Sequence, residues 1–175
     1  MACDISAGRA LTCKDAIGGL KNVYFVNYGD LPTASLTYGT DGESIAAVAG
    51  APTAFKYELH LGNDLTQNVM SSAENGTTYF EQVLNMTLKK LKKEDNVQIK
   101  QIAYGRPHVI VEDNMGNFMI VGLEFGADVT GGTAVTGNAY GDLNGYTLAL
   151  TGREKTLANF YTGNIAAEFT IVEGV

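Results

Sequence analysis

Residues 77–122, TTYFEQVLNMTLKKLKKEDNVQIKQIAYGRPHVIVEDNMGNFMIVG, decide the fold of this chain. The first of them, 77–88, alternate between apolar and polar side chains as a β-strand does, although Phe80, Leu84 and Leu88 would also fit one stripe of a helix. The Thr-Thr-Tyr-Phe opening favours the strand, because β-branched and aromatic side chains prefer extended backbone. We therefore predict a long strand that ends near Leu88.

A short helix is expected next, at about 90–104. Asp95 and Gln98 have the spacing of a capping box, in which two groups satisfy the free N–H groups at a helix start. Gly105 is a usual helix stop, and Pro107 forbids continuation. The helix should therefore end just before this glycine.

A tight β-hairpin completes the stretch. Residues 108–112 and 118–122 are dense in Val, Ile, Phe and Met, and the five residues between them, DNMGN, have the composition of a turn. His108 lies at the start of the first strand, where a packed or surface histidine is expected rather than a ligand.

Two strands are predicted upstream. Residues 20–28, LKNVYFVNY, are apolar on both faces, so this strand should be buried between two layers. Residues 54–61, AFKYELHL, alternate cleanly, with His60 on the polar side. The side chains expected to face the core are Phe55, Tyr57, Leu59 and Leu61.

The segment 29–53 leaves two interpretations open. Residues 36–38 and 45–48 could pair across the Asp41-Gly42 hairpin signal and form a protruding hairpin that packs on a neighbouring subunit. A disordered surface loop is the alternative. Residues 62–76 are read as a long polar connection.

Downstream, residues 123–144 are rich in Gly and Thr and are expected to form short strand pieces or a wandering loop. Residues 145–152 read as a strand, and residues 167–172 as the strand that closes the sheet. The chain is therefore predicted to be mainly β: an N-terminal arm at 1–19, then a single β-sandwich domain at 20–175 with one short helix on its flank.

The charge composition argues against some classes of function and favours others. The formal net charge is 12 − 19 = −7, which argues against a dedicated nucleic-acid binder. The lysine-rich run 89–93 adjoins Glu94 and Asp95 and contains no aromatic residue, so a solvated helix face is favoured over a phosphate-binding patch. Charged residues make up only 18% of the chain, which favours a surface covered by other copies.

Cysteine and histidine are scarce. Cys3 and Cys13 do not form a CxxC pair, and the chain has two His, so no metal site is predicted. Two free thiols suit a reducing compartment, and an N-terminal disulfide is the alternative. No apolar run is long enough to span a membrane, and the N-terminus lacks the pattern of a signal peptide.

No catalytic motif is present. The GxSxG, HExxH and GxGxxG patterns are all absent. Four glutamates occupy predicted strand positions, where two of them could converge as a glycosidase pair must: Glu58, Glu81, Glu112 and Glu124. Nothing in the sequence brings them together, so we expect no enzyme, no catalytic residue and no cofactor.

Several features in order resemble virion structural proteins of tailed bacteriophages. These are LKKLKKED at 88–95, the helix to Gly105, the hairpin RPHVIVEDNMGNFMIVG at 106–122, and the Gly/Thr loop leading to GNAYGDLNGYTLALTGREK at 137–155. The order is similar to that of tail-tube-like β-sandwich proteins at the tail and neck. The chain length and the N-terminus are similar to those of small ring-forming virion proteins of podovirus-like phages, including the crAss-like group.

The resemblance implies a structural subunit of a phage tail tube or neck ring. Such subunits assemble with themselves, in six- or twelve-fold rings, into a continuous β-barrel around a DNA channel. Neighbouring virion proteins are the other implied partners, and double-stranded DNA would pass without specific binding. The protein would be made in the bacterial host cytoplasm and reside in the virion.

Three segments are the expected sites of subunit contact: the arm, the 29–53 excursion and the 123–144 loop. Their candidate residues are Cys3, Cys13, Leu36, Tyr38, Ile45, Val48, Val129, Val135 and Tyr140. The acidic charge is expected to line the channel and repel DNA phosphates. Two alternatives remain open: a capsid-decorating or fibre-associated virion protein, and a monomeric β-sandwich that binds a ligand.

Overall fold

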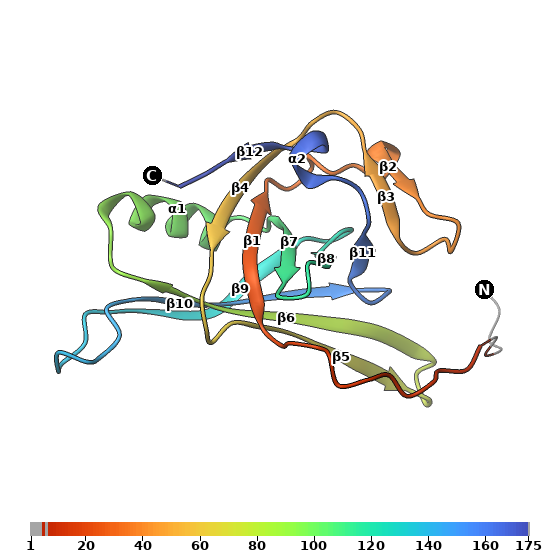
Figure 1. The fold of residues 1–175 in the computed structure, drawn as a ribbon, viewed down its shortest axis with the longest axis horizontal. Helices are drawn as coiled ribbons and strands as arrows, with labels where there is room; N and C mark the ends of the chain where they lie inside the picture. The colour runs from red at the N-terminus through yellow and green to blue at the C-terminus, as the bar shows by residue number, and fades with distance from the viewer. Residues whose placement is uncertain (1–4, 6, 175) are drawn as a thin grey trace.

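Two β-sheets pack face to face with helix α1 beside them (Figure 1). The structure is a computed structural model, and it describes residue 5 and residues 7–174. The larger sheet has eight strands, in the order β12 (Thr170–Val172), β4 (Thr53–Glu58), β1 (Leu20–Val26), β7 (His108–Asp113), β8 (Phe118–Val121), β11 (Asn159–Tyr161), β3 (Ile45–Val48) and β2 (Leu36–Tyr38). The smaller sheet has four strands, in the order β5 (Asp64–Ser72), β6 (Thr77–Lys89), β10 (Gly145–Glu154) and β9 (Ala127–Val135). In Figure 1, β1 and β4 cross over the horizontal strands of the smaller sheet, as in an orthogonal sandwich. The prediction of a mainly β sandwich is confirmed.

Strand β1 (Leu20–Val26) is the buried centre of the larger sheet, between β4 (Thr53–Glu58) and β7 (His108–Asp113). Val23 and Phe25 face the core between the two sheets, while Tyr24 and Val26 pack in a second apolar cluster on the other side. The prediction that this strand is buried on both faces is confirmed.

The long strand and the hairpin of the stretch 77–122 are also confirmed. Strand β6 (Thr77–Lys89) is the strand rather than the helix of the two interpretations, and it pairs with β10 (Gly145–Glu154) along its length. Its core-facing side chains include Leu84 and Met86. Strand β7 pairs with β8 (Phe118–Val121) as the predicted hairpin.

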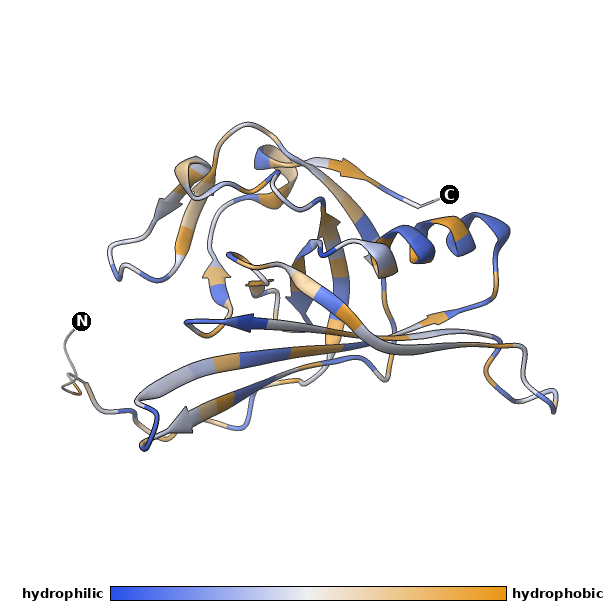
Figure 2. Cartoon of the chain, turned by 180° about the vertical axis from the view of Figure 1, so that it is seen from behind, coloured by the Kyte–Doolittle hydropathy of each residue, from blue (hydrophilic) through white to orange (hydrophobic). Residues whose placement is uncertain are grey.

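Helix α1 (Lys93–Tyr104) ends at Gly105 as predicted, but the capping box is wrong. The N-cap position is Lys92, without a side-chain cap, and Asp95 lies inside the first turn. The helix start is held instead by Tyr146 of β10, whose hydroxyl donates to Asn96 Oδ1 and contacts the carbonyl oxygen of Lys92. Figure 2 shows alternating hydrophilic and hydrophobic bands along α1, which packs its apolar side on the core.

The predicted polar connection at 62–76 is wrong, because β5 (Asp64–Ser72) pairs with β6 over nine residues. Leu65 and Val69 lie on one face of this strand with the polar Gln67 between them, and most of its side chains are exposed, as at a sheet edge. The segment 123–144, expected to form short strand pieces or a wandering loop, contains one strand, β9 (Ala127–Val135), which pairs with β10. Its remaining residues lie outside strands.

The excursion at 29–53 contains the predicted hairpin. Strand β2 (Leu36–Tyr38) follows the one-turn 3-10 helix η1 (Thr33–Ser35) and pairs with β3 (Ile45–Val48). The hairpin is anchored rather than loose, because β3 pairs in parallel with β11 (Asn159–Tyr161), and Ile45 is fully buried.

Two further expectations are corrected at strand ends. Strand β4 stops at Glu58, so Leu61 is 80% exposed instead of facing the core. Part of the closing strand predicted at 167–172 belongs to a second, one-turn helix, α2 (Ile165–Glu168). The remainder, β12 (Thr170–Val172), pairs in parallel with the first half of β4.

Candidate self-assembly surface

The four-stranded sheet ends in two long edge strands, β5 and β9, each of nine residues. Each contains one charged residue, Asp64 in β5 and Asp128 in β9, and neither contains Pro. Soluble monomers usually protect such edges with charges, prolines or covering elements, because unpaired N–H and C=O groups recruit other strands. A bulge at Thr130 is the main irregularity along β9.

Parts of these edges are contacted by the rest of the described chain, and helix α1 lies against β9. At the start of β9, the N–H of Ala127 donates to the carbonyl oxygen of Pro107 (2.9 Å), so the open edge is residues 128–135. Near the middle of β5, the side chain of Gln67 accepts from the N–H of Ala158 (2.7 Å). Most of the remaining side chains of β5 and β9 are exposed.

The directions of the two edges are complementary. Every neighbouring pair in the order β5-β6-β10-β9 is antiparallel, so β5 and β9 run in opposite directions. A rotated copy placed with its β5 beside β9 would therefore continue an antiparallel sheet, which is the more stable pairing per residue. The sheet can be extended in this way without changing its hydrogen-bond pattern.

The outward face of this sheet, turned away from the eight-stranded sheet, is rich in hydroxyl groups. Thr133 and Thr147 bond to each other across β9 and β10 (2.6 Å), as do Thr130 and Thr151 (3.0 Å). Asn85 of β6 donates to Asp64 at the β5 edge. These side chains form rows across the strands, so much of their hydrogen-bonding capacity is met within the sheet.

The outward face carries little net charge. Strand alternation places Asp64, Glu81, Asp128, Lys89 and Arg153 on it, which gives 2 − 3 = −1. Arg153 and Glu81 form an ion pair (3.0 Å). The acidic excess of the chain is therefore not concentrated here, contrary to what an acid-lined face would require.

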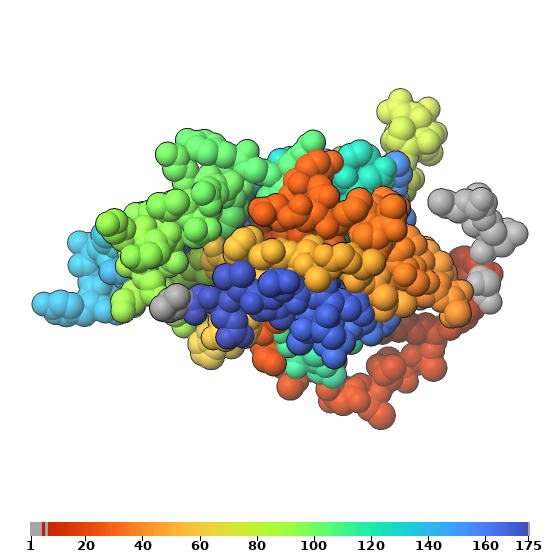
Figure 3. Space-filling model, turned by 90° about the horizontal axis from the view of Figure 1, so that it is seen from above, coloured from red at the N-terminus to blue at the C-terminus, as the bar shows by residue number. Residues whose placement is uncertain are grey.

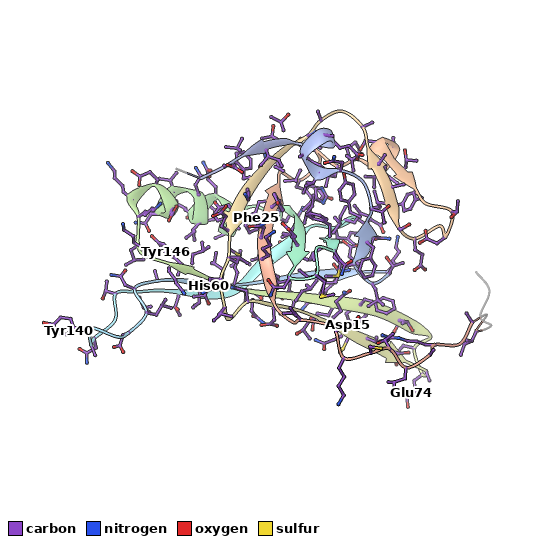
Figure 4. All side chains as sticks on the ribbon, viewed as in Figure 1. Asp15, Phe25, His60, Glu74, Tyr140 and Tyr146 are labelled. Carbon is purple, nitrogen blue, oxygen red and sulfur yellow. The ribbon has the colours of Figure 1, made fainter. Side chains whose placement is uncertain are left out.

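The two ends of the sheet project from the body (Figure 4). Glu74 marks the β5–β6 turn at one end, and Tyr140 marks the β9–β10 loop, residues 136–144, at the other. Tyr140 is fully exposed. The β5–β6 ribbon exposes Val69 (62%) and Met70 (42%), one on each of its two faces, because successive strand residues point to opposite sides.

The predicted contact residues fall in separate places. Ile45 and Val48 are buried in the protomer's own core, so their side chains cannot contact another copy in this fold. Leu36 and Tyr38 lie on β2, the far edge of the eight-stranded sheet, with Tyr38 41% exposed. Cys13 is an exposed free thiol, and Cys3 lies outside the described residues.

The remaining candidates belong to the four-stranded sheet. Val129 packs partly against the core, Val135 is at the exposed end of β9, and Tyr140 follows in the loop. Sequence reasoning missed the opposite edge, β5, because its polar residues resemble a connection. Leu65 and Val69 share one face of the strand, but the polar Gln67 stands between them, so the sequence holds only a weak period-two signal here.

The four glutamates considered for catalysis each pair with a different cation. Ion pairs join Glu112 to Lys21, Glu58 to Lys56, Glu81 to Arg153, and Glu124 to Lys155. Glu112 is buried and also accepts from the side chains of Asn22 (2.6 Å) and Tyr24 (3.2 Å). Burial, together with Glu112, raises the pKa of Tyr24 to about 12.

Two other buried titratable groups hold loops in place. His108 Nδ1 donates to the carbonyl oxygen of Gly122 (2.7 Å) and its Nε2 accepts from the N–H of Gly29 (3.2 Å); burial lowers its pKa. Glu154 accepts from the N–H groups of Glu124 and Phe125, and burial raises its pKa. Both groups have structural hydrogen-bond partners.

Neither a metal cluster nor a membrane helix is found in the described part of the chain. Residue 5 and residues 7–174 contain no group of three His, Cys, Asp or Glu that could hold a metal ion. Among the same residues, no helix is long and apolar enough to cross a membrane.

Comparisons with known proteins found no match among protein-family models, curated proteins or solved structures.

Proposed function

We propose that the chain is a structural subunit that assembles with copies of itself, through β5 of one copy and β9 of the next, into a ring of the phage tail-tube or head–tail type. The observation that carries the proposal is the four-stranded sheet with two long, weakly protected edges of opposite direction. The family is proposed from the sequence resemblance around residues 77–155.

Ring closure would remove the edges altogether. The β9 surface differs from the β5 surface, so their pairing is head-to-tail, and such contacts close into rings when the rotation between copies allows it. Six copies would join 6 × 4 = 24 strands. With strands about 4.8 Å apart and tilted by about 40°, such a barrel would be roughly 50 Å across, wider than a DNA duplex.

In this arrangement the outward face lines the channel, because the eight-stranded sheet and α1 cover the other face. The lining would be hydroxyl-rich and close to neutral, with −1 per copy, instead of strongly acidic. Since phosphate binding needs positive charge, and Arg153 is already paired with Glu81, this surface would let DNA pass without holding it.

The test is the mass of the purified chain by light scattering, with particle images. Val69→Lys adds a charge to the β5 edge at an exposed position, so we expect a folded monomer in place of a ring. Val97→Lys is the matched control, because Val97 is 54% exposed on α1 and lies on no sheet edge.

Each outcome decides between the alternatives. Six- or twelve-fold particles for the wild-type chain and Val97→Lys, but not for Val69→Lys, support the proposal. Trimers would favour capsid decoration, and a stable wild-type monomer would favour the ligand-binding module.

A further inference from the structure

The N-terminal arm, defined here as residue 5 and residues 7–19, leaves its apolar side chains in solvent. Ile5 and Leu11 are fully exposed, and Ile17 is 65% exposed. Hydrogen bonds hold the arm to the body at its root, where the side chain of Asn114 donates to the carbonyl oxygen of Gly18 (2.7 Å) and its backbone N–H to that of Gly19 (3.2 Å). The arm therefore presents apolar surface that its own protomer does not cover.

The spacing of the arm suits an extended strand. Ile5, Leu11 and Ile17 are separated by six residues each, an even number, so an extended backbone places all three on one face. The opposite face has smaller side chains around Leu11, namely Ala10 and Thr12. Such a segment can lie beside a sheet edge with one face turned inward.

The body offers an open position for such a strand. Strand β12 covers the outer edge of β4 only at Thr53–Phe55, and beyond it a groove separates β4 from α1. We name this groove the slot; the side chains that form its two walls are Phe55, Tyr57 and Glu58 of β4 and Glu94, Asp95 and Gln98 of α1. At the mouth of the slot, Glu173 pairs with Lys56 (3.0 Å).

The charges of the two parts are complementary. The slot is lined by four carboxylates (Glu58, Glu94, Asp95, Glu173) and three lysines (Lys56, Lys90, Lys92), a sum of 3 − 4 = −1. Two of those carboxylates, Glu58 and Glu173, pair with Lys56. Residues 9–13 of the arm contain Arg9 and no acid, a sum of +1, and the charges of the next two residues, Lys14 and Asp15, cancel.

The arm and the slot lie at opposite ends of the molecule. Figures 1 and 3 both show the arm leaving at the end away from α1, while α1 and the β9–β10 loop mark the other end. The strands of the four-stranded sheet run between these ends (Figure 1). An arm therefore points toward a copy displaced along the strands, not toward the copy beside an edge.

We propose that residues 9–13 of one copy bind in the slot of the next copy along the strand direction, with Leu11 turned toward Tyr57 and α1. Leu11 lies six residues from Ile17, roughly 20 Å of extended chain, which is enough to cross a contact between two copies. This inference rests on the proposed function: strand edges join copies within a ring, and the arm joins one ring to the next.

The first test compares two full-length arm variants. Leu11→Asp places a charge on the apolar face, and Thr12→Asp places the same charge on the opposite face; both positions are exposed, so neither affects folding of the body. We expect stacked rings for the wild-type chain and Thr12→Asp and single rings for Leu11→Asp, by light scattering and particle images. Stacking of Leu11→Asp like the wild type would overturn the inference.

The second test places the arm directly. In a Cys3→Ser background the native Cys13 should form a disulfide with the thiol of Gln98→Cys, which lines the slot. Because every copy carries both thiols, covalent dimers and longer multimers should appear on a non-reducing gel. Lys100→Cys, also exposed on α1 but outside the slot lining, is the matched control and should form much less. Equal yields from both variants, or none from Gln98→Cys, would refute docking in the slot.

The experiments distinguish failure of the arm inference from failure of the proposed ring. Wild-type rings that do not stack, together with no disulfide between Cys13 and the thiol of Gln98→Cys, would overturn the arm inference and leave the ring intact. The disulfide without any ring would support arm docking and overturn the proposed function. A wild-type monomer without the disulfide would overturn both.

Discussion

His108 is the residue whose surroundings give the clearest dependence of stability on pH. Burial lowers its pKa, so the folded protein keeps the ring neutral between Gly122 and Gly29, whereas the unfolded chain protonates near pH 6.5. A depressed folded-state pKa gives stability that is present above the unfolded pKa and is lost as pH falls through the folded-state pKa. The free energy of unfolding should therefore decrease below about pH 6.5.

Urea unfolding at pH 7.5 and 5.5 measures this effect, with His108→Gln as the comparison. The effect of Glu154 on the pH dependence of stability is opposite to that of His108, because its pKa is raised in the folded state. A raised carboxyl pKa gives stability that is present below the unfolded-state pKa and is lost as pH rises through the folded-state pKa. Both chains retain Glu154, so the difference between them isolates the histidine. Equal pH slopes for the two chains would show that the buried ring does not titrate as described.

For single residues, the sequence identifies apolar side chains that are candidates for subunit contact. It cannot say which of these side chains are buried in the core of their own protomer. Ile45 and Val48 belong to an Ala-rich segment with no clear core-facing period, and tertiary pairing of β3 with β11 places them inside. Tyr140 and Cys13 lie on exposed segments, where composition alone indicates a surface.

At the scale of the element, two adjacent glycines in β9 differ in what a methyl group would meet. A Cβ at Gly132 would lie 2.6 Å from the carbonyl oxygen of Thr147 in β10, whereas one at Gly131 would meet no atom within 4 Å. We expect Gly132→Ala to cost about 1–3 kcal/mol of unfolding free energy, as overpacking does. Gly131→Ala should leave stability nearly unchanged.

Chemical denaturation of the two variants checks this prediction, because they differ by one position on the same strand. A loss of stability in Gly131→Ala equal to that in Gly132→Ala would mean that both changes act through strand propensity, and that β9 does not approach β10 as closely as the structure has it.

Elements with strong periodicity can be predicted from the sequence, and those with weak periodicity cannot. Strands β1 and β6 and the β7–β8 hairpin carry dense apolar patterns and clear turn residues. Strand β5 could not be predicted from hydrophobic periodicity, because an edge strand that is exposed along most of its length contains few apolar residues. The start of α1 is predicted wrongly because tertiary contacts with Tyr146, rather than a side-chain cap, hold it.

At the scale of the whole molecule, the proposed assembly turns the four-stranded sheet into the shared part of the structure. The sequence could suggest that copies pair through sheet edges, but only the sheet order identifies β5 and β9 as the ends. The sequence also could not predict where the acidic residues lie on the surface. The chain has a net charge of −7, whereas the outward face of this sheet has a net charge of −1.

The most direct measurement is disulfide formation between single-cysteine variants of the two edges, with Cys3 and Cys13 replaced by Ser. Thr66→Cys in β5 is mixed in turn with cysteine variants at Asp128, Gly131, Thr133 and Val135 in β9, so that successive pairing registers are sampled. Head-to-tail pairing predicts covalent dimers from a β5 variant mixed with a β9 variant, and few from either variant alone. Dimers that form as readily from Thr66→Cys by itself, or no dimers in any mixture, would contradict ring formation through these edges.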